Sequence, residues 1–191
     1  METQVPGLYL IEDFLSSTEA TNLMNEINQQ TWIKNRSQTR NIQIYGPKHD
    51  QSYTIIPNDI TPLPEFLKEL SKRILETTRN KLPQIDLKDY EPYLGIDKYT
   101  EIFINEYKPE DKLDQHFDHR STYKEIIFGL SLECTSTLTF TKNNKKVKVK
   151  LPERSLYLMT GDSRNVYKHG IESGSLEGDR RVSLTFRTVN Y

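Results

Sequence analysis

The sequence predicts an α+β fold, with two amphipathic helices ahead of a series of short β-strands. Ser16 followed by Glu19 forms a capping box, and an apolar stripe with helical spacing continues to about residue 29. A second stripe starts after the prolines of residues 62–64, and Pro83 lies beyond its end. From Glu101 onward, short apolar segments alternate with turn residues, a spacing typical of a closed or sandwiched β fold.

Apolar residues one helical turn apart define the buried face of each predicted helix. In the first helix they are Ala20, Leu23, Met24 and Ile27, and in the second they are Phe66, Leu67, Leu70, Ile74 and Leu75. Neither helix offers a chemical motif, so both are expected to be scaffold. A first strand is expected within residues 5–14.

The remaining strands are expected to alternate with tight turns. They cover residues 102–107, 114–118, 126–132, 136–141, 146–151, 156–160 and 181–189. Asn143 and Asn144 predict a hairpin turn. Between the two helices, Ile42 and Ile44 alternate weakly as a short strand, and Gly46-Pro47 predicts a turn.

The composition indicates one globular domain over residues 1–191. The net charge of −1 is uninformative about partners, and the lysines of residues 142–150 are expected to form a solvated face. A single cysteine, Cys134, excludes an internal disulfide and fits a reducing compartment. Because no signal peptide and no apolar run of about 20 residues is present, we expect a cytoplasmic or nuclear monomer with no membrane segment.

The H-x-D sequence of His116 and Asp118 is the first chemical motif. If residues 113–118 are extended, both side chains project from the same face of the strand. A second imidazole from a distant strand would then complete a facial triad of two histidines and one carboxylate. That ligand set leaves coordination positions open and is typical of non-haem Fe(II) oxygenases.

His169 is the preferred second imidazole. Gly161 and Gly170 bracket its segment, which indicates backbone turns and close approaches there. His119 would lie on the opposite strand face from the H-x-D pair, and His49 lacks a carboxylate at strand spacing. An isolated histidine is more often a surface or core residue than a ligand, so this assignment depends on the whole set of motifs.

Arg181 and Arg187 form the second motif, because residues that differ by six project from the same face of a strand. Their Cα atoms would lie roughly 20 Å apart at about 3.3 Å per residue. The intervening Val182, Leu184 and Phe186 predict a packed strand, and buried arginines need anions. A dicarboxylate held between two arginines near an iron suggests 2-oxoglutarate.

These motifs occur in the order of a known family. The N-x-Y of residues 105–107, the H-x-D, the distal His169 and the R-x5-R of residues 181–187 resemble the AlkB family of 2-oxoglutarate- and Fe(II)-dependent dioxygenases. Residues 151–164, followed by 169–171, are similar to the family's strand, turn and distal-histidine segment. The resemblance covers about residues 5–189 and looks greatest to the branch that hydroxylates modified wobble uridine in tRNA.

The resemblance implies a double-stranded β-helix (jelly-roll) barrel with two supporting N-terminal helices. It also implies that Fe(II) is bound by His116, Asp118 and His169. The residues it implies for 2-oxoglutarate are Asn105, Tyr107, Arg181 and Arg187, with Arg181 at the distal carboxylate. With O2, such a centre converts 2-oxoglutarate to succinate and CO2 and hydroxylates a substrate carbon, and a hydroxylated N-methyl group leaves as formaldehyde. No catalytic residue is expected beyond the metal centre.

Residues 30–58 are the candidate substrate lid, because AlkB-like proteins cover a nucleotide substrate at this position. Aromatic side chains stack with bases and basic ones pair with phosphates, so Arg36, Arg40 and Tyr45 are candidate substrate-binding residues. The alternative is an ordinary surface hairpin whose aromatics pack inward. Arg120 is a further candidate: repair members commonly have an acid at this position, and a cation would disfavour a cationic methylated base.

Three functions remain open at the level of sequence. The favoured one is an oxygenase acting on nucleic acid, with RNA (tRNA) preferred over alkylated DNA. The tRNA branch usually contains RNA-recognition and methyltransferase domains, for which 191 residues leave no space. The alternatives are the same chemistry on protein side chains, and a non-catalytic binding domain that kept the barrel.

Overall fold

The computed structural model describes residues 1–50 and 52–190; Gln51, within the candidate lid of residues 30–58, and Tyr191 lie outside the described residues. The helices are α1 (Ser17–Gln29), α2 (Glu65–Lys81) and α3 (Gly161–Asn165). The strands are β1 (Leu8–Ile11), β2 (Ile33–Lys34), β3 (Asn41–His49), β4 (Ile55–Thr61), β5 (Thr100–Tyr107), β6 (Leu113–His116), β7 (Tyr123–Leu132), β8 (Ser136–Lys142), β9 (Lys145–Leu151), β10 (Leu156–Met159), β11 (Lys168–Leu176) and β12 (Arg181–Val189).

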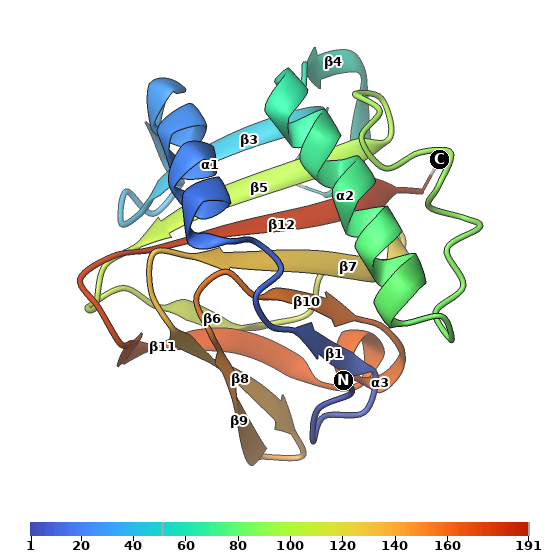
Figure 1. Ribbon diagram of the computed structural model, residues 1–191. Coiled ribbons are helices and arrows are strands. Elements are labelled where there is room, and N and C mark those ends of the chain that lie inside the picture. Colours follow the sequence, from blue (N-terminus) through green and yellow to red (C-terminus); the bar gives the residue numbers. More distant parts are fainter. Residues whose placement is uncertain (51, 191) are drawn as a thin grey trace.

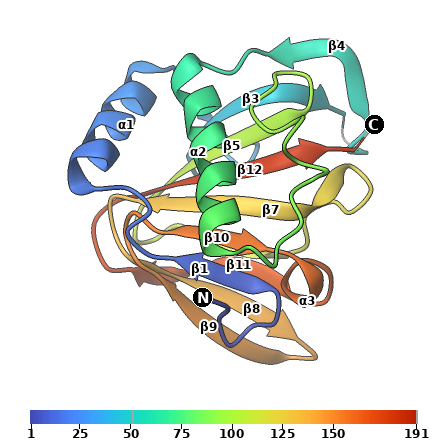
Figure 2. The ribbon, with the colours of Figure 1, turned by 45° about the vertical axis from the view of Figure 1, so that its right-hand side comes forward.

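The described strands form two antiparallel sheets. The larger has the order β1-β10-β7-β12-β5-β3-β2, with β4 paired to β3, and the smaller has the order β6-β11-β8-β9. Helices α1 and α2 lie on one side of the larger sheet and the smaller sheet lies beneath it (Figure 1). The turned view shows α2 running across the strands of the larger sheet (Figure 2). This arrangement is the expected jelly roll with two supporting helices.

The helices form as their sequences predict. The Ser16 side chain accepts a hydrogen bond from the backbone of Glu19, whose side chain accepts one from the backbone of Ser16, so the capping box is present. The buried residues of α1 and α2 share one core with apolar residues of the larger sheet, such as Ile104 and Phe128. Among the described residues, no helix is long and apolar enough to cross a membrane.

The side chains of β12 alternate between two environments, one on each face of the larger sheet. Val182, Leu184 and Phe186 pack in the core under the helices. Arg181 and Arg187 project from the opposite face, toward the space between the two sheets. The second core fills that space with residues of both sheets, including Ile127, Tyr157, Leu138, Phe140 and Ile171. The strand pattern therefore places both arginines in the interior between the sheets.

Three local predictions were wrong. Gly46 and Pro47 form no chain reversal; they lie inside β3, where Gly46 has a φ of +92° and the strand passes from pairing with β5 to pairing with β4. Strand β6 ends at His116, so Asp118 follows the strand and does not belong to it. Finally, the predicted set of strands passed from residues 156–160 to 181–189, so it gave no bounds for the strand that carries His169 and omitted α3; neither β11 nor α3 contains a long apolar repeat.

Candidate metal centre

His169 and His116 face each other across two strands of the smaller sheet. The antiparallel pairing of β11 with β6 puts the two residues opposite each other, with ring centroids 4.4 Å apart. Gly170 makes this close pairing possible, because a Cβ atom there would lie 2.4 Å from the carbonyl oxygen of Leu113. The expectation that glycine marks a close approach beside His169 is thus confirmed at Gly170.

Asp118 joins the two histidines from the segment after β6. Its Oδ2 lies 3.5 Å from Nε2 of His169, and the potential ligand atoms of His116, Asp118 and His169 all lie within 4.8 Å of one another. Arg164 of α3 donates hydrogen bonds to the carbonyl oxygens of Asp118 (2.7 Å) and His119 (3.1 Å) and so fixes this segment. The arrangement can hold a metal ion with two imidazoles and one carboxylate.

The protonation states suit metal binding. Burial lowers the pKa of His169 to about 4, so its imidazole is neutral at pH 7. Nδ1 of His116 lies 2.8 Å from the carbonyl oxygen of Asp114, an arrangement that places the proton on Nδ1 and leaves Nε2 free. Burial raises the pKa of Asp118, but Arg187 and the two histidines outweigh that effect, so the carboxylate is ionised.

Arg187 holds the carboxylate of Asp118 from the larger sheet. Its Nε and Nη2 atoms lie 2.8 and 2.7 Å from Oδ1 of Asp118, and its Nη1 lies 2.9 Å from Oε1 of Glu101. Oδ2 of Asp118 is buried and has no hydrogen-bond partner among the described residues. One oxygen is therefore fixed by the arginine while the other faces the histidines. Arg187, which the resemblance implied for 2-oxoglutarate, is thus paired with two carboxylates of the protein itself.

Arg181 lies farther along the same face, in a different setting. It is 2% exposed, its Nε donates to the hydroxyl of Ser131 (2.9 Å), and its guanidinium lies 5.4 Å from the ring centroid of Tyr107. Among the described residues it has no carboxylate partner. The side chains of Tyr107 and Asn105 make no hydrogen bond with other described residues, although both are buried. A buried cation beside two polar groups without partners fits an anionic ligand, as 2-oxoglutarate is.

Three of the four candidate substrate-binding residues are arginines, and each lies in a different setting. Arg36 is exposed in the turn after β2. Arg40 donates to the carbonyl oxygen of Lys112 and lies over the ring of Tyr107, 4.9 Å from its centroid. Arg120 is exposed, donates to the carbonyl oxygen of Asn165 and lies over the ring of Phe117.

Tyr45 does not fit the role that its position in the lid suggested. It is buried in the core under the helices, and its hydroxyl donates to Gln43 (3.1 Å). Its ring therefore packs inward, as in the alternative of an ordinary hairpin. Tyr53, in contrast, is 46% exposed on the segment between β3 and β4, where it stacks between His49 and His119 with centroid distances of 4.9 and 4.8 Å.

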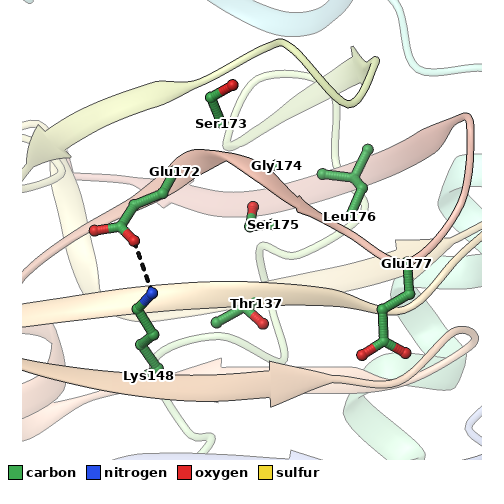
Figure 3. A pocket seen from close by; sticks show the side chains of 8 residues that line it. All are labelled: Thr137, Lys148, Glu172, Ser173, Gly174, Ser175, Leu176 and Glu177. Carbon is green, nitrogen blue, oxygen red and sulfur yellow. Dashed lines mark ion pairs between the residues drawn. The ribbon is translucent and has the colours of Figure 1, made fainter.

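Three of the lysines on β9 pair with acidic neighbours. Lys146 and Lys148 both pair with Glu172, at 2.7 and 3.0 Å, and Lys150 pairs with Glu177 at 2.8 Å. Figure 3 shows the Lys148–Glu172 pair beside a surface pocket formed where β11 bulges away from β8. This run is a solvated face, as its sequence predicted.

Several residues around the centre carry no signal in the sequence. Glu101 is a buried acid at the start of an apolar strand, Arg164 lies in a short helix, and Ser131 interrupts an apolar run. Their partners are distant in sequence, so no local spacing identifies them. Arg164 belongs to the segment that resembles the family, but no role could be assigned from its position alone.

Comparison with known protein families gives one match over nearly the whole chain: the model described as "2OG-Fe(II) oxygenase superfamily" matches residues 7–187. Uncharacterized protein L905 of Acanthamoeba polyphaga mimivirus is 28% identical over 194 residues, which cover 96% of this chain and 85% of that protein. The tRNA (carboxymethyluridine(34)-5-O)-methyltransferase ALKBH8 of Mus musculus is 30% identical over 177 residues, which cover 90% of this chain and 25% of that protein.

A third relative is the DNA N6-methyl adenine demethylase of Caenorhabditis elegans, 29% identical over 188 residues, covering 96% of this chain and 60% of that protein. The chain thus corresponds to a quarter of the methyltransferase and to about three fifths of the demethylase. Among solved structures, OsALKBH1 superposes with a TM-score of 0.66 at 18% identity, covering 97% of this chain and 100% of that one. At this identity the likeness shows the fold alone.

Proposed function

Since the chain belongs to the 2OG-Fe(II) oxygenase superfamily and is an AlkB-like dioxygenase that uses Fe(II), 2-oxoglutarate and O2, we propose that its substrate is a nucleic acid, with RNA favoured over alkylated DNA. In this proposal His116, Asp118 and His169 bind the iron. The bound iron and co-substrate supply the oxidising chemistry, and the protein orients the substrate and excludes water.

The proposed co-substrate site extends from Arg181 toward Asp118. Arg181 would bind the distal carboxylate of 2-oxoglutarate, since it is a buried cation without a carboxylate partner in the described part of the chain. Asn105 and Tyr107 would donate hydrogen bonds to the same molecule. Arg187 would keep Asp118 ionised and oriented at the metal end.

The observation that most supports a nucleic-acid substrate is the position of Tyr53. Its ring lies between those of His49 and His119, the residue next to the proposed ligand Asp118, so the three rings form one aromatic platform beside the proposed metal centre. Both faces of Tyr53 are covered within this stack, so a base would stack on the outer face of one of the two imidazoles. A surface pocket with hydroxyl and amide groups, from Ser121, Thr122 and Asn190 among others, adjoins this platform. Aromatic faces with nearby polar groups are suited to single-stranded bases.

RNA is favoured for two reasons. Relatives whose names specify tRNA modification align with most of this chain, although it covers only about a quarter of their length. Arg120, near the centre, would repel a base that carries a positive charge, which disfavours cationic methylated bases as substrates. Together these points favour an uncharged RNA base.

The test is mass spectrometry of nucleosides after incubation of the protein, Fe(II) and 2-oxoglutarate with tRNA, ribosomal RNA or alkylated DNA. We expect a new hydroxylated or demethylated nucleoside from RNA, with succinate formed alongside it, and neither product with Asp118→Ala. Modification of alkylated DNA alone would overturn the preference for RNA. Succinate formation stimulated by a protein extract but by no nucleic acid would overturn the nucleic-acid proposal and favour a protein-directed hydroxylase.

A further inference from the structure

Glu101 is a buried acid that the family motifs leave unexplained. It lies on β5, opposite Arg187 of β12, and is 1% exposed. A buried carboxylate is costly unless it is paired and hydrogen-bonded. Three side chains satisfy it: Arg187 through Nη1 (2.9 Å), His49 through Nε2 (3.1 Å), and the hydroxyl of Tyr123, 3.0 Å from both carboxylate oxygens.

The three partners of Glu101 come from different parts of the fold. Arg187 belongs to the strand beside it, Tyr123 begins β7, and His49 ends β3 next to the segment that presents Tyr53. Glu101 therefore connects the proposed metal centre to the β3–β4 hairpin, which forms part of the candidate lid.

Arg187 transmits this connection to the metal site. Two of its nitrogens hold Oδ1 of Asp118 and the third is held by Glu101, so the guanidinium is fixed between two carboxylates. In this orientation Oδ2 of Asp118 faces His169 and has no hydrogen-bond donor in the described residues. Without the charge of Glu101, the free edge of the guanidinium would turn toward Asp118 and compete with a metal ion for Oδ2.

We propose that Glu101 is a positioning residue of the metal centre, which holds Arg187 in the orientation that leaves Oδ2 of Asp118 available to the metal and, through His49, fixes the β3–β4 hairpin to the same centre. This inference depends on the proposed ligand set. It concerns the protein's own hydrogen bonds and can be tested without turnover.

The test compares Mn(II) binding by metal-free protein, measured by calorimetry, for wild type, Glu101→Gln and Glu106→Gln. Mn(II) accepts imidazole and carboxylate ligands, and it avoids oxidation during the titration. Glu106 is a matched control, because it lies on the same strand and pairs with Arg180 at 2.7 Å but does not contact Arg187. Groups that orient metal ligands typically change affinity about 10–100-fold, so a loss of about that size is expected for Glu101→Gln and none for Glu106→Gln.

A folded Glu101→Gln protein that binds Mn(II) as tightly as wild type would overturn the proposal. If that variant does not fold, Tyr123→Phe replaces it in the test, since this change keeps the ring and removes one hydrogen-bond donor to Glu101. We expect Tyr123→Phe to bind Mn(II) more weakly and to melt near the wild-type temperature. Wild-type Mn(II) affinity in this variant would again overturn the proposal. Asp118→Ala separates the two hypotheses: if it retains Mn(II) binding, the ligand assignment itself is wrong.

Hydrogen exchange tests the link to the hairpin. His49→Ala should accelerate amide exchange in β3 and β4 while leaving β12 protected, because it removes the hairpin's contact with Glu101. Unchanged exchange in the hairpin would contradict that part of the proposal.

Discussion

His169 lies directly opposite His116 in the pairing of β11 with β6, and the two rings are 4.4 Å apart. The pairing of these two strands of the smaller sheet therefore sets the distance between the two histidines. Changes that separate these two strands should therefore weaken metal binding even when they alter no ligand.

Gly170→Ala tests this dependence. The added methyl group would meet the carbonyl oxygen of Leu113 at 2.4 Å, so β6 must move away from β11. Overpacking of this kind costs about 1–3 kcal/mol, and we expect both a lower melting temperature and weaker Mn(II) binding. Ser173→Ala, an exposed change on the same strand, is the control and should alter neither. Native Mn(II) affinity in Gly170→Ala would show that the strand pairing does not set the site.

Asp118→Ala should abolish metal retention. The substitution removes the carboxylate whose Oδ2 faces the histidines, and two imidazoles alone bind Fe(II) weakly. Metal content after reconstitution with Fe(II) under anaerobic conditions measures the effect. Asp114→Ala changes an exposed carboxylate nearby, which pairs with Lys112, and should retain wild-type metal content. Equal metal content in both variants would exclude Asp118 as a ligand.

Replacing each of the two arginines of β12 by methionine should have different effects on stability and on co-substrate binding. Arg187→Met leaves the carboxylates of Asp118 and Glu101 buried without their cation, so we expect a loss of about 3–5 kcal/mol in the unfolding free energy of the metal-free protein. Arg181→Met removes a cation with no carboxylate partner in the described residues, and should cost about 1 kcal/mol or less.

For binding of 2-oxoglutarate the Arg181 variant should be the defective one, because it loses the expected partner of the distal carboxylate while the metal ligands stay intact. Urea denaturation gives the stabilities, and calorimetry of 2-oxoglutarate with the Mn(II)-loaded protein gives the affinities. Tight co-substrate binding by Arg181→Met would remove Arg181 from the proposed site.

These arginines also show how far the sequence alone could predict the structure. The alternation of β12 is a local pattern, so it correctly placed Arg181 and Arg187 on one face and the apolar residues on the other. The partners of each arginine depend on strands that are distant in sequence. Consequently, Glu101 and Ser131 could not be identified beforehand, and the end of β6 before Asp118 was missed.

The structure of the candidate lid was the least predictable part, because tertiary packing decides which of its side chains are buried. Tyr45 and Tyr53 are both aromatic residues of the candidate lid, yet one packs in the core and the other stacks with two histidines at the surface. No periodicity in residues 30–58 separates these two outcomes.

His49 should make the stability of the protein depend on pH. Its hydrogen bond to Glu101 raises its pKa above the usual value of about 6.5, against the opposing effects of burial and of Arg187. A raised folded-state pKa means that the stabilisation is complete below about pH 6.5 and is lost as the pH rises through the folded-state value. Urea denaturation of wild type and His49→Gln at several pH values should therefore show a stability difference that narrows toward alkaline pH. A constant difference would mean that the pair contributes no pH-dependent stability.

The salt dependence of RNA binding should distinguish the two basic segments. Lys34 and Arg36 are exposed within the candidate lid, whereas Lys146 is paired with Glu172 on the smaller sheet. If the lid binds phosphates, Lys34→Ala with Arg36→Ala should weaken binding of single-stranded RNA and reduce the salt slope by about 0.7 for each phosphate that the protein no longer neutralises. Lys145→Ala with Lys146→Ala removes the same charge and should leave both affinity and slope unchanged. Fluorescence anisotropy across a salt series measures both the affinity and the salt slope. Equal effects in the two double variants would mean that RNA is attracted by the general charge of the protein and that the lid has no specific role in binding.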